Sequence, residues 1–157
     1  MTPSTLSPLG ATVRGAVAGA AGTAVMTAVQ TAYYKATDSE GSNTPGEVLK
    51  RIVEGVLQRN FPEDKMGAAT QGMHWAYGTS MGVPYGIVSG SRARRPSSVI
   101  GSTLAFGLPV WAAGQVQLPA MQMAPPPWEM PASSLAMDLG FHLAYGLGGA
   151  LAWRLLR

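Results

Sequence analysis

Long stretches without charge alternate with short charged segments along this chain. Residues 15–34, 66–91 and 96–128 contain no Asp, Glu, Lys or Arg, and the stretch 130–153 contains only Asp138. A helix needs about 20 mostly apolar residues to cross a bilayer, and these charge-free runs are 20, 26 and 33 residues long. A soluble helix of such length carries charges on its outward face, because water solvates that face. The pattern therefore predicts an all-α membrane protein, a bundle of four transmembrane helices.

The four spans are expected at about 14–34, 67–87, 97–115 and 133–156, in a single domain from residue 14 to residue 157. Residues 1–13 carry Pro3 and Pro8, which predicts a flexible N-terminal tail. Pro84 is expected to kink the second span near its end. The segment from Gln117 to Pro131 contains five of the twelve prolines, so it is expected to be irregular.

A charged segment between the first two spans predicts one short amphipathic helix at about 45–59. Thr44 and Glu47 have the spacing of a capping box, with Pro45 at a favoured first helical position. Apolar residues then recur at helical spacing on one face: Val48, Leu49, Ile52, Val53, Val56 and Leu57. This helix is too short and too charged to cross a bilayer, so we expect it to lie in the interface or against the end of the bundle.

Composition narrows the class of protein further. Only 12% of residues are charged, against about 25% in ordinary soluble domains. The mean hydropathy of +0.12 and the many small residues leave a soluble helical bundle as the alternative. The net charge of +3 does not indicate nucleic-acid binding, since the basic residues flank the apolar segments. The absence of cysteine excludes disulfides, thiolate metal sites and cysteine nucleophiles.

The flanking Lys and Arg residues predict an orientation. Arg14 followed by an apolar stretch is also typical of a signal peptide, but the stretch exceeds the usual length and three more spans follow, which favours an uncleaved helix. With the N-terminus inside, six basic residues face the cytoplasm: Arg14, Arg92, Arg94, Arg95, Arg154 and Arg157. Five others, all in the charged loop, lie outside: Lys35, Lys50, Arg51, Arg59 and Lys65. Both termini are therefore expected in the cytoplasm.

Small residues predict how the helices pack. Membrane helices associate through close backbone contact, because lipid tails are as apolar as leucine. Glycines and alanines spaced four residues apart mark one face of three predicted spans: Gly15 and Gly19; Gly78, Gly82, Gly86 and Gly90; Gly140, Ala144 and Gly148. We interpret these positions as helix-packing surfaces. A glycine-lined pore is the functional alternative, although four helices leave little room for one.

Polar groups at membrane depth are the candidates for function. The chain repeats a short pattern, with His74 and Tyr77 in the second span and His142 and Tyr145 in the fourth. Asp138 lies four residues before His142, on the same helical face. Three interpretations remain open: hydrogen bonds that fix helix register, proton handling by histidine beside a carboxylate, and a metal or haem held between the two histidines.

No pattern for catalysis or for a cofactor stands out, and we predict no enzymatic activity, no cofactor and no metal. The sequence lacks a phosphate-binding loop and a zinc-protease motif. Met121 and Met123, with Met130 and Met137 nearby, offer soft ligands for Cu(I). Methionine filling gaps in a loop that rests on lipid is the simpler interpretation.

Several of these short motifs, taken in order, resemble the YagU-like inner-membrane proteins of bacteria. They are Gly15, Gly19, Gly22, Thr23 and Met26; His74, Trp75, Tyr77, Gly78, Gly82, Tyr85 and Gly86; Leu118, Pro119 and Ala120; and His142, Tyr145 and Gly146. The resemblance covers about residues 11–156 and implies a helical bundle in the bacterial cytoplasmic membrane, in a family associated with tolerance of acid. It assigns no catalytic residue. The methionine-rich stretch from Met121 to Met130 departs from the family pattern.

Three functional hypotheses follow from the sequence. The first is a non-enzymatic membrane protein of envelope or stress physiology. The second is a small transporter or channel component that handles protons, and the third is an assembly subunit whose glycine stripe binds another membrane protein. The expected partners are the lipid bilayer and either a second copy of the chain or another membrane protein, with no nucleic acid.

Overall fold

The computed structural model describes residues 6–91 and 98–156, and this part of the chain contains five α-helices and no strand. Four helices are long: α1 (Pro8–Thr37), α3 (Met66–Gly90), α4 (Val99–Ala120) and α5 (Ala132–Leu156). The shorter α2 (Thr44–Gly55) and two short 3-10 helices, η1 (Glu63–Lys65) and η2 (Pro127–Glu129), lie in the connections. The prediction of an all-helical fold with one short helix between the first two long helices is confirmed.

The first helix begins earlier than expected, because its start is capped. The Ser7 side chain accepts a hydrogen bond from the Gly10 N–H at 3.1 Å, and Pro8 occupies a first-turn position where no N–H is needed. Pro8 therefore starts α1, whereas the sequence interpretation placed it in a loose tail. Residues 1–5 of that expected tail lie outside the described residues. At the other end, Asp38 takes a left-handed conformation, with φ of 49°, and ends the helix.

Two helices also extend beyond their predicted ends. Pro84 lies inside α3, which continues to Gly90. The fourth helix contains Pro109 and Pro119 and runs to Ala120, so the expectation of irregular structure from residue 117 is wrong for its last turn. A proline removes only its own N–H from the helix, and the Met121 N–H still bonds to the Gln117 carbonyl at 3.0 Å.

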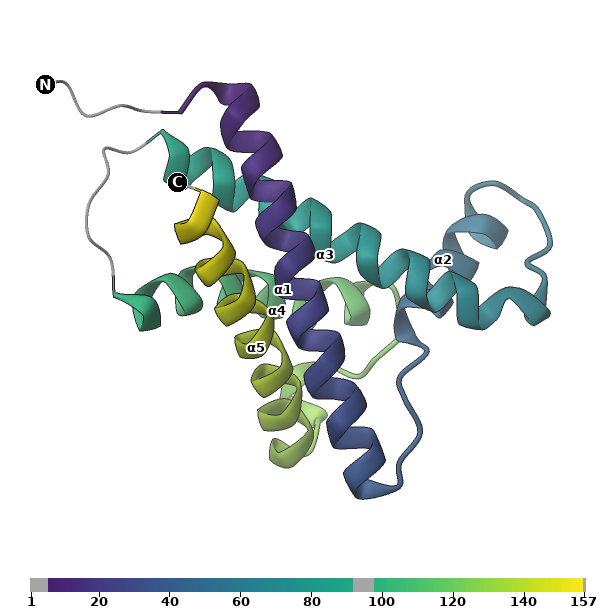
Figure 1. Ribbon diagram of the computed structural model, residues 1–157. Helices are drawn as coiled ribbons and strands as arrows, with labels where there is room; N and C mark the ends of the chain where they lie inside the picture. Colours follow the sequence, from purple (N-terminus) through teal and green to yellow (C-terminus); the bar gives the residue numbers. More distant parts are fainter. Residues whose placement is uncertain (1–5, 92–97, 157) are drawn as a thin grey trace, which may run out of the picture.

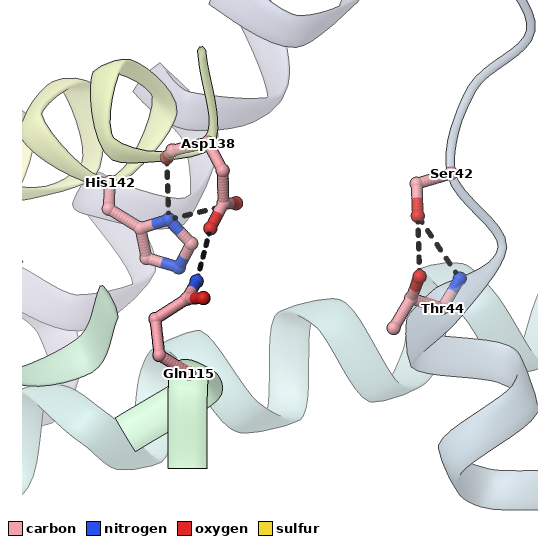
Figure 2. Close-up of polar contacts among 5 residues, drawn as sticks. All are labelled: Ser42, Thr44, Gln115, Asp138 and His142. Carbon is pink, nitrogen blue, oxygen red and sulfur yellow. Dashed lines mark hydrogen bonds and ion pairs between the residues drawn. The ribbon is translucent and has the colours of Figure 1, made fainter. Parts of the chain in front are cut away.

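The short helix α2 packs against the start of α3, as its apolar face predicted. Gly46 is buried there because a Cβ atom would lie 2.4 Å from Thr70 Oγ1. The predicted capping box is absent: the cap residue is Asn43 and makes no side-chain cap bond. Instead the Thr44 N–H and hydroxyl both bond to Ser42 Oγ, at 3.2 and 2.8 Å (Figure 2).

An ion pair joins α2 to η1. The Lys50 ammonium donates a hydrogen bond to the Glu63 carboxylate, and this bond raises the pKa of Lys50. Because that pKa is raised, the contribution of the pair to folding is present at neutral pH and is lost as the pH rises through the pKa of the folded chain. The pair is exposed to solvent, so we expect its effect on stability to be small.

The long helices alternate in direction: the start of α1 and the ends of α3 and α5 lie toward the upper left, whereas the opposite ends spread apart toward the bottom and the right (Figure 1). The start of α1 lies beside the end of α3, where the Leu6 N–H donates to the Gly90 carbonyl at 3.1 Å. Helix α1 packs extensively against both α3 and α5, and α5 packs against α4. Direct contact between α3 and α4 is sparse, and side chains bridge most of the space between them.

Glycine residues allow close approach at each of the three extensive interfaces. Between α1 and α3, a Cβ atom on Gly82 would lie 2.1 Å from the Gly15 carbonyl oxygen. Between α4 and α5, a Cβ atom on Gly107 would lie 2.4 Å from the His142 carbonyl oxygen. Between α1 and α5, one on Gly148 would lie 2.7 Å from Val25 Cγ2. At Gly82 and Gly107 the neighbouring backbone is therefore too close for a side chain, and at Gly148 the Val25 side chain takes that space.

The packing predictions can be checked position by position. Predicted glycines that meet backbone or side-chain atoms of a neighbouring helix are Gly15, Gly19, Gly78, Gly82, Gly86, Gly90 and Gly148. The prediction is wrong for Gly140, which is exposed with open space around it, since α5 turns this position away from its neighbours. Gly107 and Gly146, which approach each other between α4 and α5, were not predicted as packing positions.

The core consists mainly of aromatic side chains. Tyr145, Phe106 and Trp153 are almost fully buried, and the Tyr85 ring of α3 lies 4.3 Å from the Phe106 ring and 5.7 Å from the Trp153 ring. These centroid distances are typical of favourable aromatic contacts. Side chains from α3, α4 and α5 thus fill the space where α3 and α4 lack direct contact.

The outward faces of α1, α4 and α5 are rich in apolar side chains. Exposed large side chains recur at intervals of four or eight residues on α1 (Leu9, Val13, Val17, Val25 and Val29), on α4 (Ile100, Leu104, Leu108 and Val116) and on α5 (Leu147, Leu151 and Leu155). By length and composition, α1 and α4 are apolar enough to cross a membrane. An apolar surface this extensive is unusual for a soluble monomer.

Candidate functional site

Three bonded polar side chains lie between α4 and α5: His142, Asp138 and Gln115 (Figure 2). Of these, His142 and Asp138 were predicted from the sequence. The His142 Nδ1 atom lies 2.8 Å from the backbone carbonyl oxygen of Asp138 and 3.4 Å from Asp138 Oδ1. The Gln115 side-chain amide donates to Asp138 Oδ2 at 2.9 Å. Both carboxylate oxygens of Asp138 therefore face N–H donors, which is the arrangement that suits an ionised carboxylate.

The hydrogen bonds of His142 also determine its tautomer. A carbonyl oxygen can only accept, so Nδ1 carries the proton that bonds to the Asp138 backbone. In the neutral ring, Nε2 is then the nitrogen that can accept a proton. The helix turn that precedes His142 therefore fixes this tautomer, and Asp138 Oδ1 lies beside the same nitrogen.

The other histidine, His74, belongs to a bond between α1 and α3. Its Nε2 atom lies 3.1 Å from Thr27 Oγ1. The Thr27 hydroxyl already donates its one proton to the Thr23 carbonyl at 2.8 Å. The oxygen of Thr27 must therefore accept from His74, so His74 carries its proton on Nε2 and leaves Nδ1 bare in the neutral ring.

The two tyrosines make further bonds between helices. The Tyr145 hydroxyl, on α5, donates to the carbonyl oxygen of Gly78 on α3 at 2.7 Å, and both residues are buried. The Tyr77 hydroxyl donates to Gln117 Oε1 of α4 at 3.2 Å. Because α3 and α4 have little direct contact, this second bond is one of the few links between them.

The five predicted residues thus belong to four separate hydrogen-bonded groups. Asp138 and His142 are the only two of the five that bond to each other. Sequence reasoning missed the partners Thr27, Gln115 and Gln117. The two glutamines were detectable as polar residues at the end of a charge-free stretch. The spacing of Thr23 and Thr27 was a signal too, since threonine four residues after a carbonyl bonds back to it in a helix.

Other predicted sites receive less support from the geometry. Within residues 6–91 and 98–156, no group of three or more His, Cys, Asp or Glu side chains is arranged to hold a metal ion. The glycine stripe of α3, considered as a surface for another membrane protein, is covered by α1, whose Gly15 and Gly19 meet it. That stripe is an internal packing surface of this chain, so it does not serve as the docking surface in the assembly-subunit hypothesis, which stays a prediction. The arginines 92, 94 and 95 lie outside the described residues.

Comparisons with known proteins add no family or relative. No protein-family model matches the chain, and neither the curated proteins nor the solved structures contain a significant match to it.

Proposed function

We propose that this chain is an integral membrane protein in which α1, α3, α4 and α5 each cross the bilayer, with both termini in the cytoplasm. Support comes from the apolar outward faces and from the alternating directions of the four helices. By length and composition α3 and α5 are not among the helices apolar enough to cross a membrane, and they carry glycines, tyrosines and histidines. Their outward faces carry apolar side chains such as Ile87 and Leu151.

In this arrangement α2 lies at the outer membrane surface. It packs on the start of α3 and carries charged residues that water must solvate. Val56 and Leu57, just after the helix, are 74% and 58% exposed, so they are free to enter the apolar edge of the interface. Trp128 of η2 is 82% exposed, and its indole ring lies at the same depth of the membrane interface.

The proposed activity is non-enzymatic handling of protons at the Asp138–His142 pair. The main observation in its support is the geometry of this pair. The Nδ1–H of His142 bonds to Asp138, so Nε2 remains able to accept a proton. A lone carboxylate is costly in a medium of low dielectric constant, and a proton on His142 converts the site to a neutral ion pair. Gln115 donates to the carboxylate in either state.

The YagU-like resemblance, which we retain as a proposal, agrees with this activity, because that family is associated with tolerance of acid. Envelope physiology under acid stress is then the setting in which a proton-binding membrane bundle would act.

The Asp138→Asn variant tests this proposal. We expect this variant to lose most of its proton uptake in lipid vesicles, because the carboxylate that faces the His142 ring is gone. The measurement is the proton uptake of vesicles that contain the protein, followed with an enclosed pH-sensitive dye.

Asp38→Asn is the matched control, since it removes one exposed carboxylate from the end of α1 at a left-handed position that asparagine also tolerates. The control should take up protons like the native chain. If the native chain and Asp138→Asn take up protons equally, with the helical content of both intact, the proton-handling proposal is wrong.

A further inference from the structure

Helix α4 packs tightly over its first half and loosely over its second half. All of its buried residues lie at or before Val110: Ser102, Phe106, Gly107 and Val110. In the first half, the Phe106 ring contacts the Tyr85 and Tyr145 rings, at centroid distances of 4.3 and 5.3 Å. In the second half, residues 111–120, no side chain belongs to the hydrophobic core or packs against it. The apolar core therefore fixes the first half of α4 only.

Pro109 lies at the boundary between these two halves. A proline has no N–H, so the Ala105 carbonyl, four residues earlier, receives no helical hydrogen bond from this position. Just before it, Gly107 is held against α5, since a Cβ atom there would lie 2.4 Å from the His142 carbonyl oxygen. A missing backbone bond next to an anchored residue is an arrangement that allows a helix to bend at that point.

Hydrogen bonds to two glutamines hold the second half of α4 in place. The Gln115 amide donates to Asp138 on α5 at 2.9 Å, and Gln117 accepts from the Tyr77 hydroxyl on α3 at 3.2 Å. The Trp111 Nε1 atom is buried without a hydrogen-bond partner among the described residues. A buried donor without a partner is costly, and outward movement of this half would let water bond to it. The observed position of residues 111–120 is thus held by few interactions.

We infer that residues 111–120 form a gate segment that swings about Pro109 and controls the access of water to the Asp138–His142 pair. This inference rests on the proposed function and adds the regulation of the same site. With the gate segment closed, the side chain of His142 is only 16% exposed and that of Asp138 is 37% exposed. Opening breaks the bonds of Gln115 and Gln117 and exposes His142 Nε2 to water, from which it takes its proton.

Distances between spin labels, measured by pulsed EPR on the full chain in lipid nanodiscs, test the gate segment. The native chain has no cysteine, so Val116→Cys in the gate segment and Gly140→Cys in α5 place one label each at exposed positions. We expect a main distance and a second, longer distance from the open position. The reference pair is Ile100→Cys, in the first half of α4, with Leu151→Cys in α5, and it should give one distance throughout.

Three variants shift the position of the gate segment in opposite directions. Gln117→Leu and Tyr77→Phe remove the same hydrogen bond from its two sides. Each should raise the ratio of the longer to the main distance by about fivefold, the factor that corresponds to one ordinary hydrogen bond. Pro109→Ala restores the backbone bond to Ala105 and should reduce the longer distance. Pro119→Ala is the matched control, because it makes the same change beyond the hinge, in the last turn of α4, and should behave as the native chain.

The results separate this inference from the proposed function. If none of Gln117→Leu, Tyr77→Phe and Pro109→Ala changes the distances, the gate segment does not move, whatever the proton uptake. A moving gate segment should also make proton uptake into vesicles slower in Pro109→Ala, with the same final amount as in the native chain. Uptake at the native rate in that variant would mean that the movement does not control access to the pair. If Asp138→Asn takes up protons like the native chain, the proposed function fails, and the role in proton access fails with it.

Discussion

Replacing Gly82 with alanine should separate α1 from α3 and destabilise the bundle by about 3 kcal/mol, at the upper end of the range for overpacked interiors. The added Cβ would lie 2.1 Å from the Gly15 carbonyl oxygen and 2.7 Å from the Gly19 Cα atom. These neighbours are backbone atoms of an adjacent helix, so no side-chain rotation relieves the clash. Thermal unfolding in mild detergent, followed by circular dichroism, measures the effect.

Gly140→Ala is the matched control, because no atom lies within 4 Å of the Cβ it would add. Alanine is favoured over glycine inside a helix by about 1 kcal/mol, so this variant should be as stable as the native chain or more so. Equal stability of Gly82→Ala and Gly140→Ala would mean that the two helices do not pack at this distance.

Replacing Leu108 with lysine should prevent stable membrane insertion of α4. Leu108 lies near the middle of the helix and is 37% exposed on the outward face. A lysine at the centre of a transmembrane helix costs about 3 kcal/mol, whereas an exposed leucine-to-lysine change on a soluble protein is nearly neutral. The fraction of the chain that resists alkaline extraction from membranes measures the difference.

Val116→Lys provides the comparison on the same helix. Val116 is 69% exposed and lies one turn from the end of α4, where a lysine side chain can extend to the headgroups. This variant should remain in the membrane fraction. If both variants extract like the native chain, the outward face of α4 does not contact lipid.

The helices were predictable because charge-free runs and turn residues mark them, but their ends were not. Ser7 with Pro8 begins α1 through a local cap that the count of prolines concealed. Pro119 was taken as a helix breaker, although a proline in the last turn removes only one backbone bond. These details depend on which groups bond at each terminus, and hydrophobic patterning does not report them.

The candidate site was predictable only within one helix. The four-residue spacing of Asp138 and His142 places them on one face wherever α5 packs, and the structure brings them together. The partners Thr27 and Gln115 belong to α1 and α4, so their contacts depend on how those helices cross α3 and α5. The same dependence explains Gly140, since the face that α5 turns toward its neighbours is decided by tertiary packing.

The number of membrane crossings is the central claim, and single-cysteine accessibility tests it most directly. The native chain has no cysteine, so Glu54→Cys, Ser91→Cys and Glu129→Cys can each be labelled with an impermeant thiol reagent in intact cells, then after lysis. Four crossings predict that residues 54 and 129 react from outside and that residue 91 reacts only after lysis. If residues 54 and 91 react from the same side, α3 does not cross the bilayer and the four-span account is contradicted.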